Sequence, residues 1–169
     1  MRRIVLAALA LMAACGHKKI APPRQDRRQT IDRLTLSQSD HGRPEWTLHS
    51  RTAVLREDAD IADLQVPDMD FYQENRVASH VTSLTGTVQT VTHDVRLSNS
   101  VVLDSYADHS RLYTEVLYYS SKTGLFHTDE EVKVVRPEGV AYGKGMEATP
   151  DLSEVKIFHQ HSVLSGKTQ

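Results

Sequence analysis

The chain has 169 residues, of which 39% are hydrophobic and 25% are charged, with 20 Lys and Arg residues against 22 Asp and Glu residues. This size and composition fit one folded domain with its own core and exclude a chain that is disordered throughout. A formal net charge of −2 gives no overall attraction to nucleic acid, and a single cysteine excludes an internal disulfide and a zinc site built from several thiolates.

Residues 1–14 predict a secretory signal peptide. Arg2 and Arg3 precede an uninterrupted apolar run from Ile4 to Ala14. A helix of this length covers roughly half of the hydrocarbon core of a bilayer, which is too short for a comfortable membrane span. The run ends in Met12-Ala13-Ala14-Cys15, which resembles a bacterial lipobox, so Cys15 is predicted to be acylated and to become the new N-terminus. An ordinary signal peptide, or an uncleaved short anchor with an incidental cysteine, is the alternative.

Residues 15–30 are predicted to form a lipidated basic tether. The segment has few apolar side chains and contains Pro22-Pro23 together with several Lys and Arg residues. Adjacent prolines stiffen an extended chain, and basic residues close to an anchor favour anionic lipid headgroups. A plain flexible linker would have the same composition.

Residues 31–160 predict short β-strands and contain no convincing amphipathic helix. The alternating or β-branched runs are Ile31–Ser37, Trp46–Arg56, Ile61–Val66, Met69–Gln73, Val77–Leu84, Thr87–Thr92, Val95–Leu97, Val101–Tyr106, Leu112–Tyr119, Leu125–Thr128, Val132–Arg136, Val140–Ala148 and Val155–His159. Turns are expected around Gly42, Pro67, Gly124, Pro137 and Pro150. About a dozen strands of this kind indicate an all-β sandwich, barrel or roll.

A loose internal repeat accompanies the strands. Trp46, Ala78, Leu112 and Ala141 each open a block that runs through a strand and a turn to a second strand rich in valine or isoleucine. A stacked repeat would place equivalent strands beside one another in an elongated roll. Such a roll has two open ends with unpaired backbone groups, which suit the addition of a strand from a similar partner.

Alternation along these strands predicts one apolar face. Its members alternate with charged or polar residues and include Leu48, Leu112, Thr114, Val116, Val132, Val134, Met146, Val155 and Ile157. A packed core is the ordinary explanation. A lipid-lined groove would show the same pattern, because acyl chains and core side chains need the same apolar surface.

Catalytic and metal-binding patterns are weak in this sequence. His159 and His161 share one strand face, but no third ligand stands near them in the sequence, and residues 161–169 are expected to be a polar tail. Gly143-Lys144-Gly145 is not followed by a helix that would make it a phosphate loop, and no Gly-x-Ser-x-Gly motif is present. We therefore predict no enzyme activity, no cofactor and no resident metal.

The segment from Arg111 to Val135 resembles the most recognisable part of the LptC family, the periplasmic component of the bacterial lipopolysaccharide-export machinery, within the wider OstA-like group. The family's strand, turn and threonine-aspartate pattern matches Leu112, Thr114, Leu117, Tyr119, Thr128, Asp129, Val132 and Val134. Gly143, Gly145, Met146, Ala148, Val155 and Ile157 fit its following two strands, and Trp46, Leu48 and Ala53 fit its opening strand. One departure is the lipoprotein-type signal, where family members often keep a transmembrane helix.

The resemblance implies a twisted antiparallel β-jellyroll over residues 31–160 whose open groove binds the acyl chains of lipid A. The protein would then relay lipopolysaccharide from the inner-membrane ABC transporter to a periplasmic bridge protein of the same fold. Combined with the alternation, it predicts that the groove is lined by Leu48, Leu112, Thr114, Leu117, Phe126, Val132, Val134, Met146 and Ile157. Gly143 and Gly145 are expected to allow a close backbone approach or a bulge.

The expected location is the periplasm, with Cys15 anchored in the inner membrane and an outer-membrane anchor as the alternative. Gly16 would stand second in the mature chain, where many lipoproteins retained at the inner membrane have an aspartate. Two other functions remain open at this point. One is a soluble bridge protein of the OstA-like group, and the other is a structural lipoprotein domain that carries no lipid.

Overall fold

The computed structural model describes residues 28–163, and all of its regular structure in this range is β-strand. The strands are β1 (Arg28–Asp40), β2 (Arg43–Arg56), β3 (Ile61–Gln73), β4 (Arg76–Thr82), β5 (Thr85–Gln89), β6 (Val95–Ser105), β7 (Arg111–Ser120), β8 (Leu125–Arg136), β9 (Gly139–Ala148) and β10 (Val155–Val163). The predicted signal peptide, Cys15 and most of the predicted tether lie outside the described residues.

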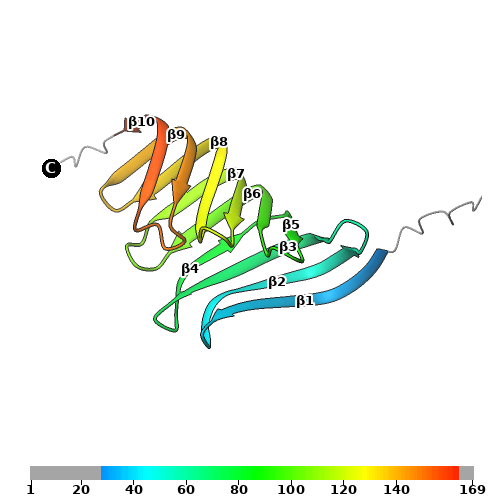
Figure 1. Cartoon of the computed structure of the whole chain (residues 1–169). Coiled ribbons are helices and arrows are strands. Elements are labelled where there is room, and N and C mark those ends of the chain that lie inside the picture. Colours follow the sequence, from blue (N-terminus) through cyan, green and yellow to red (C-terminus); the bar gives the residue numbers. More distant parts are fainter. Residues whose placement is uncertain (1–27, 164–169) are drawn as a thin grey trace, which may run out of the picture.

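All ten strands belong to one antiparallel sheet in the order β1-β2-β3-β4-β6-β7-β8-β9-β10, with β5 paired to β3 and β6. The strands β4 and β5 are two halves of one broken strand, because β4 pairs with one part of β3 and β6 and β5 pairs with the other part. Figure 1 shows β1–β3 in the lower part of the molecule and β6–β10 stacked in the upper part, so the sheet twists from one end to the other. The strands β1 and β10 are the two edges of the sheet.

Most strands are interrupted near their middle, and the interruptions line up across the sheet. The backbone has positive φ at Arg33, Val66, Asn99, Ser100 and Gly145, and the register shifts within the pairs β6–β7, β7–β8 and β8–β9. Bulges of this kind bend a strand and increase its twist. We call this row of irregular positions the bend line, because the sheet folds over on itself along it.

The bend line divides the sheet into two layers. Layer one contains the half-strands 34–40, 43–50, 67–73, 76–82, 101–105, 111–114, 131–136, 139–144 and 159–163, and layer two contains 28–32, 52–56, 61–65, 85–89, 95–98, 116–120, 125–128, 146–148 and 155–157. The layers face each other, since Phe71 of layer one stacks edge-on against Tyr119 and Phe126 of layer two at ring-centroid distances of 4.9 and 5.0 Å.

Buried hydroxyl groups hold the bend line together. Ser50 donates to the carbonyl oxygens of Thr52 and Gln65, and Thr114 donates to those of Val116 and Glu131. Ser83 likewise donates to the carbonyl oxygen of Thr85. These carbonyls lie where a bulge interrupts the strand ladder, and a buried carbonyl without a partner would cost about 1–3 kcal/mol. The three hydroxyls stand about one repeat apart in the sequence, although not at the same place within the repeated blocks.

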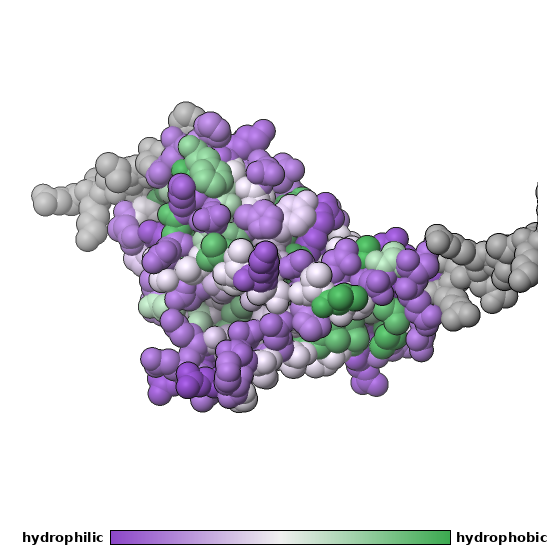
Figure 2. Space-filling model, in the orientation of Figure 1, coloured by the Kyte–Doolittle hydropathy of each residue, from purple (hydrophilic) through white to green (hydrophobic). Residues whose placement is uncertain are grey.

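The core fills the space between the layers. It contains Trp46, Leu48, Ala53, Ala62, Leu64, Met69, Phe71, Val81, Val88, Val95, Leu97, Val101, Leu103, Leu112, Leu117, Tyr119, Phe126, Val132, Val134, Met146, Ala148 and Leu152. Three of its members, Leu48, Val81 and Leu112, stand two residues before the bend-line hydroxyls and are fully buried. On the face that Figure 2 shows, polar residues cover most of the surface and hydrophobic residues lie in separate areas between them.

The prediction of an all-β jellyroll is confirmed, but the strands are longer than the sequence runs. Pairs of runs on either side of 67, 98–100 and 129–131 join into the single strands β3, β6 and β8. The predicted turn at Val66-Pro67-Asp68 is wrong, because these residues lie inside β3 at the bend line. Proline fits there because the backbone already departs from regular pairing. The turns at 41–42, 121–124, 137–138 and 149–154 do separate strands.

Candidate functional site

The residues predicted to line a groove all come from the inner face of the folded sheet. Eight of them are buried between the layers, namely Leu48, Leu112, Thr114, Leu117, Phe126, Val132, Val134 and Met146, and Ile157 on the edge strand β10 is partly buried. The structure therefore brings this set together on one continuous apolar face. In this structure their side chains pack against one another and against the rest of the core.

Two of these residues have inward positions that simple alternation does not explain. Thr114 and Leu117 both point inward although they are three residues apart, because the bulge between them in β7 moves the inward phase by one residue. The neighbouring Val116, which alternation placed inward, is only partly buried. Thr114 turns its hydroxyl to backbone carbonyls of the bend line, so its polar group is satisfied inside the interior.

The two glycines of β9 lie where β10 crosses close to the backbone. A Cβ atom at Gly143 would stand 2.2 Å from Cγ2 of Ile157 and 2.7 Å from the carbonyl oxygen of His159. Gly145 has a φ of +74°, a conformation that side-chain-bearing residues rarely adopt, and a Cβ atom there would stand 2.9 Å from the ring of Phe158. Both positions therefore bring β10 close to β9 at the bend line.

An aromatic cluster closes the interior on the side opposite the bend line. Tyr119 packs edge-on against Phe71, Phe126 and Trp46, at ring-centroid distances of 4.9, 5.5 and 6.5 Å. The ring of His93 extends the cluster from the other side of Trp46, at 6.3 Å. Edge-on packing of this kind adds to the stabilisation from burial alone.

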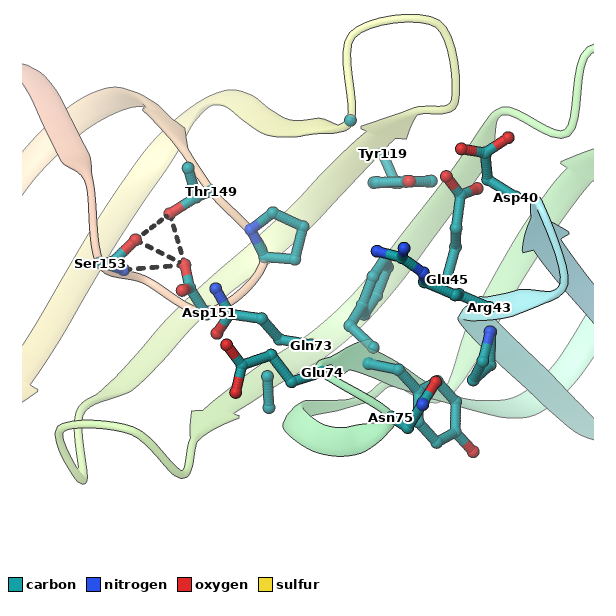
Figure 3. A pocket seen from close by; sticks show the side chains of 16 residues that line it. Asp40, Arg43, Glu45, Gln73, Glu74, Asn75, Tyr119, Thr149, Asp151 and Ser153 are labelled. Atoms are coloured by element: carbon teal, nitrogen blue, oxygen red, sulfur yellow. Dashed lines mark hydrogen bonds between the residues drawn. The ribbon is translucent and has the colours of Figure 1, made fainter.

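A pocket of about 560 Å³ opens directly above this cluster, and we call it the mouth. Its wall is formed by residues from four hairpin turns and the adjoining strand ends: Asp40, Arg43, Pro44, Glu45, Phe71, Tyr72, Gln73, Glu74, Asn75, Ala78, Tyr119, Gly124, Thr149, Pro150, Asp151 and Ser153. Figure 3 shows Asp40, Arg43 and Glu45 on one side of the mouth and Thr149, Asp151 and Ser153 on the other. Phe71 and Tyr119 belong both to this wall and to the core.

The charge at the mouth is mainly negative. The carboxylates of Asp40, Glu45, Glu74 and Asp151 face one guanidinium group, that of Arg43, among the residues of the wall. Burial raises the pKa of Tyr119 to about 12, and the negative charges of Glu45 and Asp94 act in the same direction. The hydroxyl of Tyr119 is therefore protonated at neutral pH, and the base of the mouth is uncharged.

The turn between β9 and β10 forms one side of the mouth and is held by its own hydrogen bonds. The carboxylate of Asp151 accepts hydrogen bonds from the hydroxyl of Thr149 at 2.7 Å and from the hydroxyl and backbone N–H of Ser153 at 2.7 and 3.1 Å. Partial burial opposes the ionisation of Asp151, but these hydrogen bonds outweigh it and lower the pKa of the carboxyl.

Leu152 lies at the tip of this turn and yet is fully buried. Its φ of 58° is a left-handed conformation that costs a leucine about 1–2 kcal/mol. Burying the side chain in the core stabilises by a comparable amount or more, which explains why the strained conformation persists. The turn thus inserts a leucine between the layers beside the mouth.

Sequence reasoning missed Phe71 and Leu152 as residues of this region and did not assign Tyr119 to the groove. The inward position of Phe71 follows from alternation with Met69 once the bend at Pro67 is known. No local sequence pattern indicates that Leu152 is buried, because a lone leucine in a turn of polar residues is normally solvent-exposed.

No group of three or more His, Cys, Asp or Glu side chains is placed to hold a metal ion within residues 28–163. In the same range, no helix is long and apolar enough to cross a membrane.

Comparison with known protein families gives a match over nearly the whole chain. A family described as "Lipopolysaccharide-assembly, LptC-related" matches residues 4–162. No curated protein matches the chain. The matched range takes in all of the described strands except the last residue of β10, and therefore includes the interior face, the bend line and the mouth.

Proposed function

The chain belongs to the LptC family, and from that premise we propose that it binds the acyl chains of lipid A between its two layers and relays lipopolysaccharide across the periplasm. Membership in the family implies involvement in lipopolysaccharide transport, at the periplasmic side of the inner membrane and together with the export transporter. The finer steps are the proposal: the transporter hands lipopolysaccharide to this protein, which passes it to a periplasmic bridge protein of the same fold.

The observation that carries this proposal is the continuous apolar face inside the folded sheet. Inward residues contribute to it from β2 in the lower part of the molecule to β10 at its far edge. Each CH₂ group of an acyl chain that moves from water to such a surface gains about 0.8 kcal/mol, so the face can hold acyl chains without forming any covalent bond. Binding requires the layers to separate, because core side chains fill the interior in this structure.

The two edge strands supply the means of passing lipid onward. Among the described strands, β1 and β10 each pair with one neighbour, so the outer edge of each can accept a further strand. Strand pairing with a protein of the same fold would make the two apolar faces continuous. The predicted anchor at Cys15 precedes β1, so we assign β1 to the membrane side and β10 to the bridge protein.

We further propose that Cys15 attaches the protein to the inner membrane through its acyl group. This residue lies outside the described part of the chain, and the proposal rests on the signal sequence. Mass spectrometry of the mature protein tests it: we expect an acylated cysteine at the N-terminus, and an unmodified Cys15 or a retained Met1 would contradict the proposal.

Photo-crosslinking in cells tests the lipid-binding face. A photo-reactive amino acid at Leu117 or Met146, both fully buried on the inner face, is expected to capture lipopolysaccharide. Lys133 is the matched outer control, because it pairs across strands with Tyr113 and Tyr142 on the opposite face of the sheet and its ammonium group lies over their rings. Capture at Lys133 without capture at Leu117 and Met146 would show that the inner face of the sheet is not the lipid-binding face.

Depletion of the protein in cells tests the role in transport. We expect lipopolysaccharide to accumulate at the inner membrane and a transporter complex to copurify with the tagged protein. Copurification with the bridge protein's partners but not with the transporter would instead indicate a bridge-type protein. Normal lipopolysaccharide location together with no bound lipid would indicate a structural domain.

A further inference from the structure

At the mouth, residues of the core form part of the wall of a pocket that is open to solvent. Phe71 and Tyr119 line the pocket and also contact Phe126, whose side chain is fully buried. The route from the pocket to the predicted lipid-binding residues therefore passes through one layer of aromatic rings. On the opposite side, backbone pairing and buried hydroxyl groups join the layers along the bend line.

Two side-chain hydrogen bonds join the layers near the mouth. On one side, Gln38 of β1 accepts a hydrogen bond from the hydroxyl of Ser121 at 3.2 Å. On the other side, the hydroxyl of Ser105 in β6 donates to the backbone carbonyl of Asp151 at 2.7 Å. The residues that they join are 83 and 46 positions apart in the chain, so each bond closes the folded sheet rather than a local turn.

The two sides differ in how they are held. Ser121 is also fixed by a backbone hydrogen bond to the carboxylate of Asp94. The turn 149–154 is closed on itself by the bond from the Thr149 N–H to the Glu154 carbonyl and by the Asp151 bonds. Among the described residues, the Ser105 bond is the hydrogen bond that ties this turn to another strand. The buried side chain of Leu152 is the turn's other attachment to the core, so the turn can move as a unit when that bond breaks and Leu152 leaves its place.

We infer that the mouth is where an acyl chain of lipopolysaccharide enters the interior, and that the β9–β10 turn is the gate, with Leu152 occupying the place that the acyl chain takes. This inference rests on the proposed function. Leu152 is an apolar side chain held between the layers in a strained backbone conformation, so its exchange for another apolar chain loses little burial and relieves the strain.

The charge of the mouth supports an acyl chain as the occupant. The carboxylates of Asp40, Glu45 and Glu74 outnumber the guanidinium of Arg43 in the wall, so phosphate groups of the lipid headgroup are repelled from it. The uncharged rings of Phe71 and Tyr119 form the base. An acyl chain thus enters while the anionic headgroup stays outside.

The test compares three serine-to-alanine variants of the full chain by the initial rate at which each takes up fluorescently labelled lipopolysaccharide. Ser105→Ala removes the bond that holds the gate, and we expect uptake about five times faster, the effect of losing one hydrogen bond of ordinary strength. Ser79→Ala is the matched control, because Ser79 pairs with Ser105 across strands and is equally buried, but its hydroxyl has no hydrogen-bond partner. Ser121→Ala removes the hydrogen bond to Gln38 on the other side of the mouth and is the second control. We expect Ser79→Ala and Ser121→Ala to stay within twofold of the wild-type rate.

A reversible crosslink provides the second measurement. Gln38→Cys with Ser121→Cys, in a Cys15→Ser background that leaves no other thiol, is bridged by a bifunctional methanethiosulfonate reagent, whose spacer replaces the length of the Gln38 side chain. The bridged protein is expected to take up lipopolysaccharide at the rate of the same protein after reductant has removed the bridge.

An unchanged rate in Ser105→Ala, or a loss of uptake in the bridged protein that reductant reverses, overturns the assignment of the β9–β10 turn as the gate. If the wild-type protein itself takes up no lipopolysaccharide, the proposed function is wrong, and the inference about the gate is wrong as well. The two failures are thus distinguishable.

Discussion

The bend line and the mouth close the same folded sheet on opposite sides, and they do so by different means. Along the bend line, the buried hydroxyls of Ser50, Ser83 and Thr114 bond carbonyls at interrupted ladders, closely packed glycines lie in β9, and the strands pass directly from one layer to the other. At the mouth, hairpin turns from the two layers meet through two side-chain hydrogen bonds and a set of aromatic rings.

This difference indicates which side of the sheet can open. Parting the layers at the bend line would break backbone pairing in several strands at once, whereas parting them at the mouth breaks a few side-chain contacts. The bend line therefore behaves as a hinge and the mouth as an opening. The following predictions compare the two regions, from the largest expected effect to the smallest.

The largest contrast is expected between two fully buried leucines, Leu112 beside the bend line and Leu152 in the mouth turn. We expect Leu112→Ala to lower the free energy of unfolding by about 4 kcal/mol and Leu152→Ala by about 2 kcal/mol, because a turn can shift to fill the cavity and a central strand cannot. Chemical denaturation of both variants measures the difference. Equal losses would contradict the view that the mouth is the more adaptable region.

Two glycines test backbone crowding in the same regions. Gly143→Ala is expected to cost about 3 kcal/mol, because its Cβ atom would overlap Ile157 and the His159 carbonyl in the adjacent strand. Gly124 lies in the mouth wall at a φ of +69° with no atom within 4 Å of an added Cβ, so Gly124→Ala is expected to cost only about 1 kcal/mol from backbone strain. Thermal unfolding of both variants measures the order, and a larger loss at Gly124 would refute it.

Removal of one bend-line hydroxyl should have a smaller effect. Thr114→Val keeps the shape of the side chain but leaves the carbonyls of Val116 and Glu131 without this donor, and we expect a loss of about 1–2 kcal/mol in the free energy of unfolding. Thr82→Val, at an exposed position of β4, is the control and should change stability by less than about 0.5 kcal/mol. A Thr114→Val protein as stable as the control would show that the hydroxyl does not support the bend.

The smallest effect concerns the pH dependence of the mouth turn. The folded-state pKa of Asp151 lies below its ordinary value of 3.8, so its ionised form stabilises the fold at pH values above about 3.8, and this contribution is lost as the pH falls through the folded-state pKa. Denaturation of the wild-type protein and of Asp151→Asn at about pH 7 and about pH 2.5 measures it. The difference between the two proteins should be largest at neutral pH, and a difference independent of pH would contradict this role of the carboxylate.

Most of the interior face could be predicted from the sequence, because a strand with one buried side repeats its apolar residues at every second position. This periodicity is visible for Leu112 and Thr114 and for Val132 and Val134. The same rule fails at the bend line. A bulge moves the inward phase by one residue, so simple alternation predicts an inward Val116, which is only partly buried, and two separate strands on either side of Pro67, which are one strand, β3.

The sequence by itself determined an all-β chain with one apolar face, a repeat of about the length of a hairpin, and membership of the LptC family over nearly its whole length. These properties depend on local alternation and on motif spacing, which need no knowledge of distant contacts. Only the tertiary structure decided where the sheet folds, which turns meet at the mouth, and that a turn residue, Leu152, completes the core. The physical reason is that these features join residues far apart in the chain, such as Gln38 with Ser121 and Ser105 with Asp151, and no local pattern encodes such a meeting.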